Sequence, residues 1–448
     1  MATRARGRAF ARARDRARSR RLALPLLTAV VALPRLAVLV AERREILLPY
    51  TYGEKSDDFA RTFVDSGTFG FVAGVPSAYT QPLYSAFLIP LYATVGRSWA
   101  VVGGAQILVA LATAWIVYET GRRWISPQAG LVAALVATLH PYVVWHDVHV
   151  NREVLDALLA AAIVLVTLTV ARTRSLPHAA ALGAVLGVAI LGNVRLAALP
   201  LVLAAFLVWH WRPGRRSLAT AALALGTCAL VVAPWVVRNR VEVGCFALTT
   251  DSRALWEANN ERTLDTLRAG LWIDNVALPA GFPPSAQDAS RAYYREGRRL
   301  EVDECAQMRF YRELVLDFWR EQPGEKALLA LQATLMLWNP SVTPSDTRGV
   351  AEDWLNTLRA SVEPLYMVAV YALALWGLTR VPRLLAALAL TLLAYQWLLA
   401  MVFVGATRYR VPWDVVLALL AGAAAVDLAA RVSRRLPAAG RREAGAPP

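Results

Sequence analysis

Two adjacent carboxylates, Asp57 and Asp58, lie just after the first apolar segment of this sequence. Neighbouring residues of a helix point about a quarter turn apart, so the two acids suit separate roles better than one shared proton. One carboxylate can take a proton from an attacking hydroxyl while the other orients that base or binds a cation. The competing interpretation is an ordinary helix start, with Ser56 as the N-cap and Arg61 pairing with either acid.

A third acid, Glu153, opens a later apolar segment, and Asp156 follows it one turn deeper. Acids inside a membrane segment usually face a cavity or a partner, so Glu153 is a candidate catalytic residue. The nearby His146 and His149 are metal-ligand types, but a polar turn between two spans is the simpler interpretation of them.

Arginines lie at the ends of several apolar segments. Arg35 is near the end of the first segment, Arg195 begins another, and Arg408 and Arg410 flank Tyr409 before the last. Each guanidinium alone can extend to the lipid headgroups. Guanidinium groups also bind phosphate through paired, directional hydrogen bonds. Transfer of a group from a lipid-linked phosphate requires acids that activate a nucleophile and arginines that hold the phosphate.

The elements that must position these residues are membrane helices. Of the 448 residues, 57% are hydrophobic and 18% are charged, and many uncharged runs approach the ~20 residues that cross a bilayer. So many consecutive runs exclude a large soluble protein. The predicted spans are about 22–41, 99–119, 128–146, 153–171, 178–193, 195–211, 218–237, 362–379, 383–404 and 411–430.

The distribution of positive charge orients these spans. The basic clusters between spans all fall on the cytoplasmic side if residues 82–96 form an in-plane helix on the outer side. The clusters are Arg122-Arg123, Arg172 with Arg174, Arg212 with Arg215-Arg216, Arg380 with Arg383, and the tail from Arg431. They account for the net charge of +15 without a nucleic-acid partner. We therefore expect about ten spans in the cytoplasmic membrane, with both termini cytoplasmic and the site extracytoplasmic.

The domain organisation follows from this topology. A basic tail (1–21) precedes a membrane core (22–237) whose first outer loop is 42–98. A large outer loop (238–361), C-terminal spans (362–430) and a second basic tail (431–448) follow. Within the large loop we expect an amphipathic helix at 289–320 and an apolar helix at 326–338. Cys245 and Cys305 both lie there, either as a disulfide or as two free thiols.

Several motifs, taken in order, resemble a known family. They are Asp57-Asp58-Phe59-Ala60-Arg61, Gln81-Pro82-Leu83-Tyr84 through Gly96, Pro234-Trp235, Arg238-Asn239, Gly244, Phe246, Leu248-Thr249-Thr250, Asn259-Asn260, and Arg408-Tyr409-Arg410 with Pro412. Over about residues 22–430 the sequence resembles the GT-C superfamily of membrane glycosyltransferases. The closest branch is the protein O-mannosyltransferase and lipid A aminoarabinose transferase group, in its dolichyl-phosphate-mannose-transferase-like form.

The resemblance implies an all-α membrane protein of the GT-C type that moves a sugar from a polyprenyl-phosphate donor by inverting transfer. Asp57 would be the base, with Asp58 and Glu153 in support. The phosphate would contact Arg408 first, with Arg35, Arg195, Arg238 and Arg410 as further candidates, and Tyr409 would position the donor. A divalent cation, Mg²⁺ or Mn²⁺, is an open expectation, and the acceptor is a glycan, lipid or protein.

Two other function classes compete with the glycosyltransferase hypothesis. A transporter or lipid flippase is expected to show paired, interrupted helices in two related halves, and no such symmetry is visible. A non-enzymatic scaffold would explain the outer loop but not the ordered acids and arginines. The glycosyltransferase is the leading hypothesis.

Overall fold

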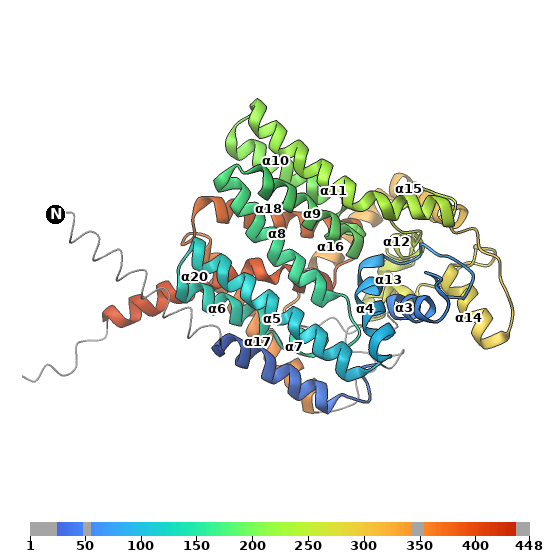
Figure 1. The fold of residues 1–448 in the computed structure, drawn as a ribbon, viewed down its shortest axis with the longest axis horizontal. Helices are drawn as coiled ribbons and strands as arrows, with labels where there is room; N and C mark the ends of the chain where they lie inside the picture. Colours follow the sequence, from blue (N-terminus) through green and yellow to red (C-terminus); the bar gives the residue numbers. More distant parts are fainter. Residues whose placement is uncertain (1–24, 48–54, 342–353, 436–448) are drawn as a thin grey trace, which may run out of the picture.

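The computed structural model describes residues 25–47, 55–341 and 354–435 (Figure 1). These residues are helical, with no named strand among them and one isolated bridge between Val72 and Val75. The predicted basic tail at 1–21, and the second tail beyond residue 435, lie outside the described residues. The predicted all-α membrane fold is confirmed.

Six helices of the described part are long and apolar enough to cross a membrane. They are α5 (Trp99–Trp124), α8 (Glu153–Thr173), η1 with α10 (Val194–Trp211), α11 (Arg215–Glu242), α18 (Arg383–Val402), and the run through α19 and α20 (Thr407–Arg434). Shorter apolar helices are Pro25–Ala41, α4 (Pro82–Val95), α6 (Pro127–Thr138), α9 (Leu176–Gly192) and the Ser361–Gly377 part of α17 (Trp354–Gly377). Each predicted span coincides with one of these helices or with a broken helix.

Three predicted spans are interrupted. The expected helix at 128–146 is wrong as a single element, because α6 ends at Thr138 and a separate helix, α7, covers Pro141–His146. Proline lacks an N–H and disfavours helix at the residue before it, and His140 caps α7 by accepting from the N–H of Tyr142. The span at 195–211 opens as a 3₁₀ turn, η1 (Val194–Ala198), before α10 (Leu199–Trp211). The last opens with α19 (Thr407–Arg410) and η4 (Val411–Trp413), before α20 (Asp414–Arg435).

Small residues let the membrane helices approach closely. A Cβ built on Gly183 of α9 would lie 2.2 Å from the carbonyl oxygen of Ala224 on α11. Similarly, a Cβ built on Gly130 of α6 would lie 2.5 Å from the carbonyl oxygen of Tyr118 on α5. Close backbone approach is how helices gain packing energy in lipid, where burying apolar surface supplies little.

The helices of the two predicted outer loops, which we call the outer elements, gather at one end of this bundle (Figure 1). They are α3 (Lys55–Ser66), α4, α12 (Arg253–Glu257), α13 (Thr263–Arg268), η2 (Ile273–Asn275), α14 (Ala286–Glu296), α15 (Glu304–Glu321) and α16 (Pro323–Trp338). A disulfide between Cys245 and Cys305 joins the segment after α11 to the first turn of α15. The sequence left open whether these cysteines form a disulfide or stay as two free thiols, and the structure shows the disulfide.

The predicted helix at 289–320 is wrong as one element. Gly297, at φ 65°, ends α14 in the left-handed conformation that glycine adopts without strain. Helix α15 restarts after Asp303, whose side chain accepts from the N–H of Ala306. The apolar helix expected at 326–338 is confirmed as α16.

Candidate functional site

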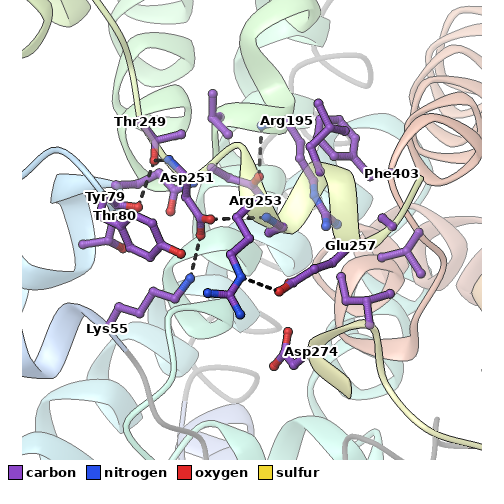
Figure 2. A pocket seen from close by; sticks show the side chains of 18 of the residues that line it. Lys55, Tyr79, Thr80, Arg195, Thr249, Asp251, Arg253, Glu257, Asp274 and Phe403 are labelled. Carbon is purple, nitrogen blue, oxygen red and sulfur yellow. Dashed lines mark hydrogen bonds and ion pairs between the residues drawn. The ribbon is translucent and has the colours of Figure 1, made fainter. Parts of the chain in front are cut away.

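A cavity of about 380 Å³ lies where the outer elements meet the bundle (Figure 2). Helix α8 and η1 begin at this end, and α9 and α18 finish there. The charged side chains that line the cavity are Lys55, Arg152, Arg195, Arg253, Arg291, Arg408, Asp251, Glu257 and Asp274. Cations outnumber acids among them, so the cavity favours an anion.

One part of the cavity wall is formed by Arg152, Arg195 and Arg408. The guanidinium of Arg195 lies 3.5 Å from the ring centroid of Tyr409. Both Arg152 and Arg408 act on Arg195 as repelling like charges. An anion between these guanidiniums would relieve the repulsion that Arg152 and Arg408 exert on Arg195. We name these three residues the arginine cluster.

Glu153 orients the arginine cluster. Its carboxylate forms an ion pair with Arg408 at 3.2 Å, although 153 and 408 belong to helices far apart in the sequence. The adjacent Arg152 donates to the Oε1 atom of Gln81 at 3.0 Å. Glu153 therefore lies beside the cavity arginines, and its side chain is only 7% exposed.

The opposite part of the cavity wall is acidic. Lys55 Nζ lies 2.6 Å from Asp251 Oδ2, and Arg253 Nε donates to Glu257 Oε1 at 2.8 Å. Burial by itself would lower the pKa of Lys55, but the adjacent Asp251 outweighs burial and raises that pKa. We name the carboxylates Asp251, Glu257 and Asp274 the acid group.

Glu257 has the most altered proton affinity of the acid group. Burial raises the pKa of Glu257 to about 7, and the like charges of Asp274 and Asp251 add to this rise. Arg253 opposes the rise but is shared, because its Nη1 also donates to Asp288 at 2.5 Å.

Residues of the family-like motifs hold the outer segments in place around the cavity. The carboxylate of Glu304 accepts from the N–H of Ala78 at 3.0 Å and from the hydroxyl of Thr250 at 2.5 Å. Asn259 accepts from Lys326 Nζ at 2.5 Å. These bonds join three segments of the outer region and place the backbone on either side of the cavity.

The predicted base, Asp57, does not line the cavity. Arg97 holds it through two hydrogen bonds of 3.1 and 2.7 Å, and the hydroxyl of Tyr92 donates to it at 2.5 Å. The carboxylate is buried and bonded on both oxygens, and its role as base stays a prediction. Asp58 also lies off the cavity, half exposed and 3.9 Å from Arg61. Because α3 begins at Lys55, Ser56 lies within the helix and is not its N-cap.

Three predicted phosphate ligands also lie elsewhere. Arg35 is fully buried and bonded to Asp147 at 2.7 Å. Arg410 is 2% exposed and bonded to Asp414 and to the carbonyl oxygen of Leu337. Arg238 donates to the carbonyl oxygens of Ser77 and Phe69. The structure therefore brings Arg195, Arg408 and Tyr409 to the cavity with Glu153 beside them, and directs these other arginines to structural bonds.

Several cavity residues were missed in the sequence. Lys55 is one of only two lysines in an arginine-rich chain and directly precedes the acid pair. Arg152 is adjacent to the predicted Glu153. Arg253 and Glu257 stand four residues apart, the spacing of a helical ion pair. These signals were available, but ion pairs of this kind are common on solvated helices and did not distinguish a site.

In the described part of the chain, no group of three or more His, Cys, Asp or Glu side chains has the arrangement of a metal site. His146 and His149 stack on Tyr142 and Trp145 with ring centroids 3.6 and 3.8 Å apart. The predicted polar turn is therefore packed inside the protein, with both histidines buried.

The membrane-length helices, with an arginine-lined cavity at one end of the bundle, define the class as a multi-pass membrane protein. Residues 80–237 match the family described as dolichyl-phosphate-mannose-protein mannosyltransferase. The match agrees with the predicted family resemblance over that segment, which includes Arg152, Glu153 and Arg195.

Solved structures show more distant similarity. ArnT from Cupriavidus metallidurans bound to undecaprenyl phosphate is 17% identical with a TM-score of 0.45, covering 92% of this chain and 80% of ArnT. AglB, the archaeal oligosaccharyltransferase from Archaeoglobus fulgidus, in complex with an inhibitory peptide and a dolichol-phosphate, is 11% identical with a TM-score of 0.49. That match covers 93% of this chain and 52% of AglB. No curated protein matches the sequence.

Proposed function

We propose that this protein transfers a sugar from a polyprenyl-phosphate donor to an acceptor at the outer face of the cytoplasmic membrane, with inversion at the anomeric carbon. The observation that carries the proposal is the arginine cluster, in which Arg152, Arg195 and Arg408 line the wall of one cavity. A lipid-linked phosphate would place its negative charge among these guanidiniums, with paired hydrogen bonds.

The charge distribution supports an outer location. Helix α8 begins at the cavity with Glu153 and carries Arg172 in its last turn. In the same way, the segment that begins with Arg195 at the cavity ends at Arg212. Because basic loops favour the cytoplasm, the cavity end should face outward.

The position of the cavity also argues against the transporter alternative. Transporter sites lie near the middle of the bilayer, between interrupted helices. Here the arginine cluster lies where η1 and α19 begin, at the ends of membrane helices. A donor whose lipid tail stays in the bilayer can present its phosphate at such a boundary.

The divalent cation stays a prediction, and the described residues hold no group of His, Cys, Asp and Glu arranged as a metal site. Carboxylates of the acid group already pair with Lys55 and Arg253. The arginine cluster can neutralise a leaving phosphate by itself, which is the role a metal would otherwise fill. We therefore propose transfer without a required metal, to be checked by adding EDTA to the assay.

The proposal is tested by binding and turnover. Purified protein in nanodiscs should bind undecaprenyl phosphate and release polyprenyl phosphate from at least one donor in a panel of polyprenyl-phosphate sugars. Arg195→Ala should weaken binding of undecaprenyl phosphate about 10- to 100-fold, the loss of one or two charge-assisted hydrogen bonds. Arg320→Ala is the matched control, because Arg320 is exposed on α15 and lies off the cavity. Equal binding by both variants and the wild type would contradict the proposal.

A further inference from the structure

Two residues at the end of α4 hold the carboxylate of Asp57, the predicted base. Arg97 Nε donates to Oδ1 at 3.1 Å, Arg97 Nη2 donates to Oδ2 at 2.7 Å, and the hydroxyl of Tyr92 donates to Oδ1 at 2.5 Å. Paired hydrogen bonds from a planar guanidinium fix the plane of a carboxylate as well as its distance. Asp57 therefore has one defined direction before any substrate binds.

The backbone at Gly96 explains how Arg97 reaches Asp57. Helix α4 ends at Gly96, whose φ of 78° and ψ of 177° belong to a region that glycine alone adopts readily. A Cβ built on Gly96 would meet no atom within 4 Å, so the glycine serves the turn of the chain and not a close approach. After this turn Arg97 lies against α3, and its Nη2 also donates to the carbonyl oxygen of Leu47 at 2.7 Å.

Asp57 and its neighbour Asp58 differ in how they are held. Asp58 is half exposed and lies 3.9 Å from Arg61, a contact longer than a hydrogen bond. The side chain of Asp57 is 9% exposed, and that of Arg97 is 28% exposed. A charge-assisted hydrogen bond is stronger where it is shielded from water. Of the two acids, Asp57 is thus the one whose direction Arg97 fixes.

We propose that Arg97 is a positioning residue for Asp57, whose carboxylate it aims at the hydroxyl of the acceptor. This role rests on the proposed glycosyltransferase function, with Asp57 as its base. A carboxylate can accept about four hydrogen bonds, so those from Arg97 and Tyr92 leave it the capacity to accept one from that hydroxyl. Orientation is a large term in catalysis, because misplacing a reacting group by about 1 Å costs about 10²-fold in rate.

The transfer step balances with Asp57 in this position. Asp57 takes the proton of the acceptor hydroxyl as the hydroxyl oxygen bonds to the anomeric carbon of the sugar. The bond from that carbon to the phosphate oxygen breaks, and its electron pair leaves with the phosphate. The arginine cluster stabilises the charge that develops on the leaving polyprenyl phosphate. Arg97 acts on this step only through the direction of the carboxylate.

A purely structural ion pair is the competing interpretation. Arg35 and Asp147 form such a pair inside the bundle, with Arg35 fully buried. The bond from Arg97 to the carbonyl oxygen of Leu47 also ties the segment after the first apolar helix to the end of α4. The chemical step must therefore be measured apart from folding and from donor binding.

The experiment measures turnover of nanodisc-embedded protein with the panel of polyprenyl-phosphate sugars and with membrane extract as the acceptor source. Arg97→Ala should lower kcat about 10²-fold. Its KM for the donor and its binding of undecaprenyl phosphate should stay within about 2-fold of wild type, because the arginine cluster is intact. Arg97→Lys should restore part of kcat, since it keeps the charge but loses the paired geometry.

Two further variants calibrate this effect. Tyr92→Phe removes one bond to the same carboxylate and should lower kcat about 10-fold, the loss of one hydrogen bond to a charged group. Arg320→Ala is the control, because Arg320 is exposed on α15, and it should equal wild type in both turnover and binding.

A double-mutant cycle separates positioning from structure. Asp57→Asn should lower kcat about 10²- to 10⁴-fold, the usual contribution of a general base. Adding Arg97→Ala to Asp57→Asn should cause no further loss, because Arg97 acts through the carboxylate. If the two losses multiply, or if Arg97→Ala keeps the wild-type kcat, the positioning role is wrong while the proposed function stands. Wild-type kcat in Asp57→Asn would remove the base and the positioning role together.

Gly96→Ala covers the case in which Arg97→Ala does not fold. It keeps both charges and adds no clash, but it strains the turn that directs Arg97. It should lower kcat about 10-fold with unchanged binding of undecaprenyl phosphate, and an unchanged kcat would contradict the role of Arg97. If wild type shows neither turnover with any donor nor binding of undecaprenyl phosphate, the proposed function fails and the positioning role fails with it.

Discussion

Arginine occupies two contrasting regions of this molecule, the interior of the helix bundle and the wall of the cavity. In the interior, Arg35 and Arg410 are 0% and 2% exposed and each is bonded to an aspartate and to backbone carbonyl oxygens. In the cavity wall, Arg195 lies on the ring of Tyr409, and Arg408 is more exposed than the interior arginines and paired with Glu153.

The difference lies in what each guanidinium faces. Burying a charge costs several kcal/mol unless its partners are well placed, so Arg35 and Arg410 each pair with a buried aspartate, and neither lines the cavity. The three residues of the arginine cluster line the cavity, and Arg152 and Arg408 act on Arg195 as like charges. Interior arginines therefore determine how helices pack, whereas those that line the cavity can reach an anion.

The largest expected effect comes from breaking an interior pair. Arg35→Ala should destabilise the protein by about 3–5 kcal/mol, because Asp147 is left buried and charged without its partner. Thermal unfolding in detergent, followed by circular dichroism, checks this. The double variant Arg35→Leu with Asp147→Leu should recover most of the loss. If the double variant is as unstable as the single one, the unpaired charge of Asp147 does not cause the loss of stability.

A smaller effect is expected from opening the Cys245–Cys305 disulfide. The paired serine variant Cys245→Ser with Cys305→Ser should destabilise the outer region by about 2–4 kcal/mol through lost chain restraint. Since Cys305 follows Glu304, which binds Ala78 and Thr250, the cavity should loosen while the bundle persists. Hydrogen exchange should rise in residues 245–305 and stay unchanged in α8 and α9. A uniform rise would contradict this separation.

A cavity arginine should affect binding more than stability. Arg408→Ala should weaken undecaprenyl phosphate binding about 10- to 100-fold, with a change in unfolding temperature well below that of Arg35→Ala. Isothermal titration in nanodiscs measures the first quantity. Arg408→Lys should restore charge but only part of the affinity, because the paired geometry of guanidinium is lost. The reverse ranking, with Arg408→Ala the less stable protein, would remove the distinction between the two regions.

The smallest effect is expected at the exposed surface. Arg320 pairs with Asp317 at 3.3 Å, and its side chain is 73% exposed. Arg320→Ala should change stability by less than about 1 kcal/mol and leave undecaprenyl phosphate binding unaltered. Losses comparable to those of Arg408→Ala would mean that net charge, and not the arginine cluster, governs binding.

Most of the fold could be predicted from the sequence because membrane helices are local patterns. Uncharged runs of sufficient length mark the spans, and only local chemistry was misjudged. Pro141 breaks the third span, and Gly297 ends α14 where one long helix was expected. Both errors involve residues whose backbone preferences oppose helix, so the sequence carried the signal.

The site was predicted only in part, and neighbouring residues show why. Arg408 and Arg410 stand two positions apart on α19, which turns their side chains roughly 200° away from each other. One lines the cavity and the other binds Asp414 inside the bundle. Composition alone cannot decide which residue has which role, because both are arginines beside the same tyrosine.

The sequence by itself determined the helical class, the clustering of basic residues between spans and the presence of acids and arginines at helix ends. These properties depend on residues close together in the chain. Tertiary structure alone decided that Asp57 meets Arg97, that Glu153 meets Arg408 and that Glu257 joins the cavity. Such contacts join segments separated by long stretches of chain, and their geometry follows from how the helices pack rather than from any local pattern.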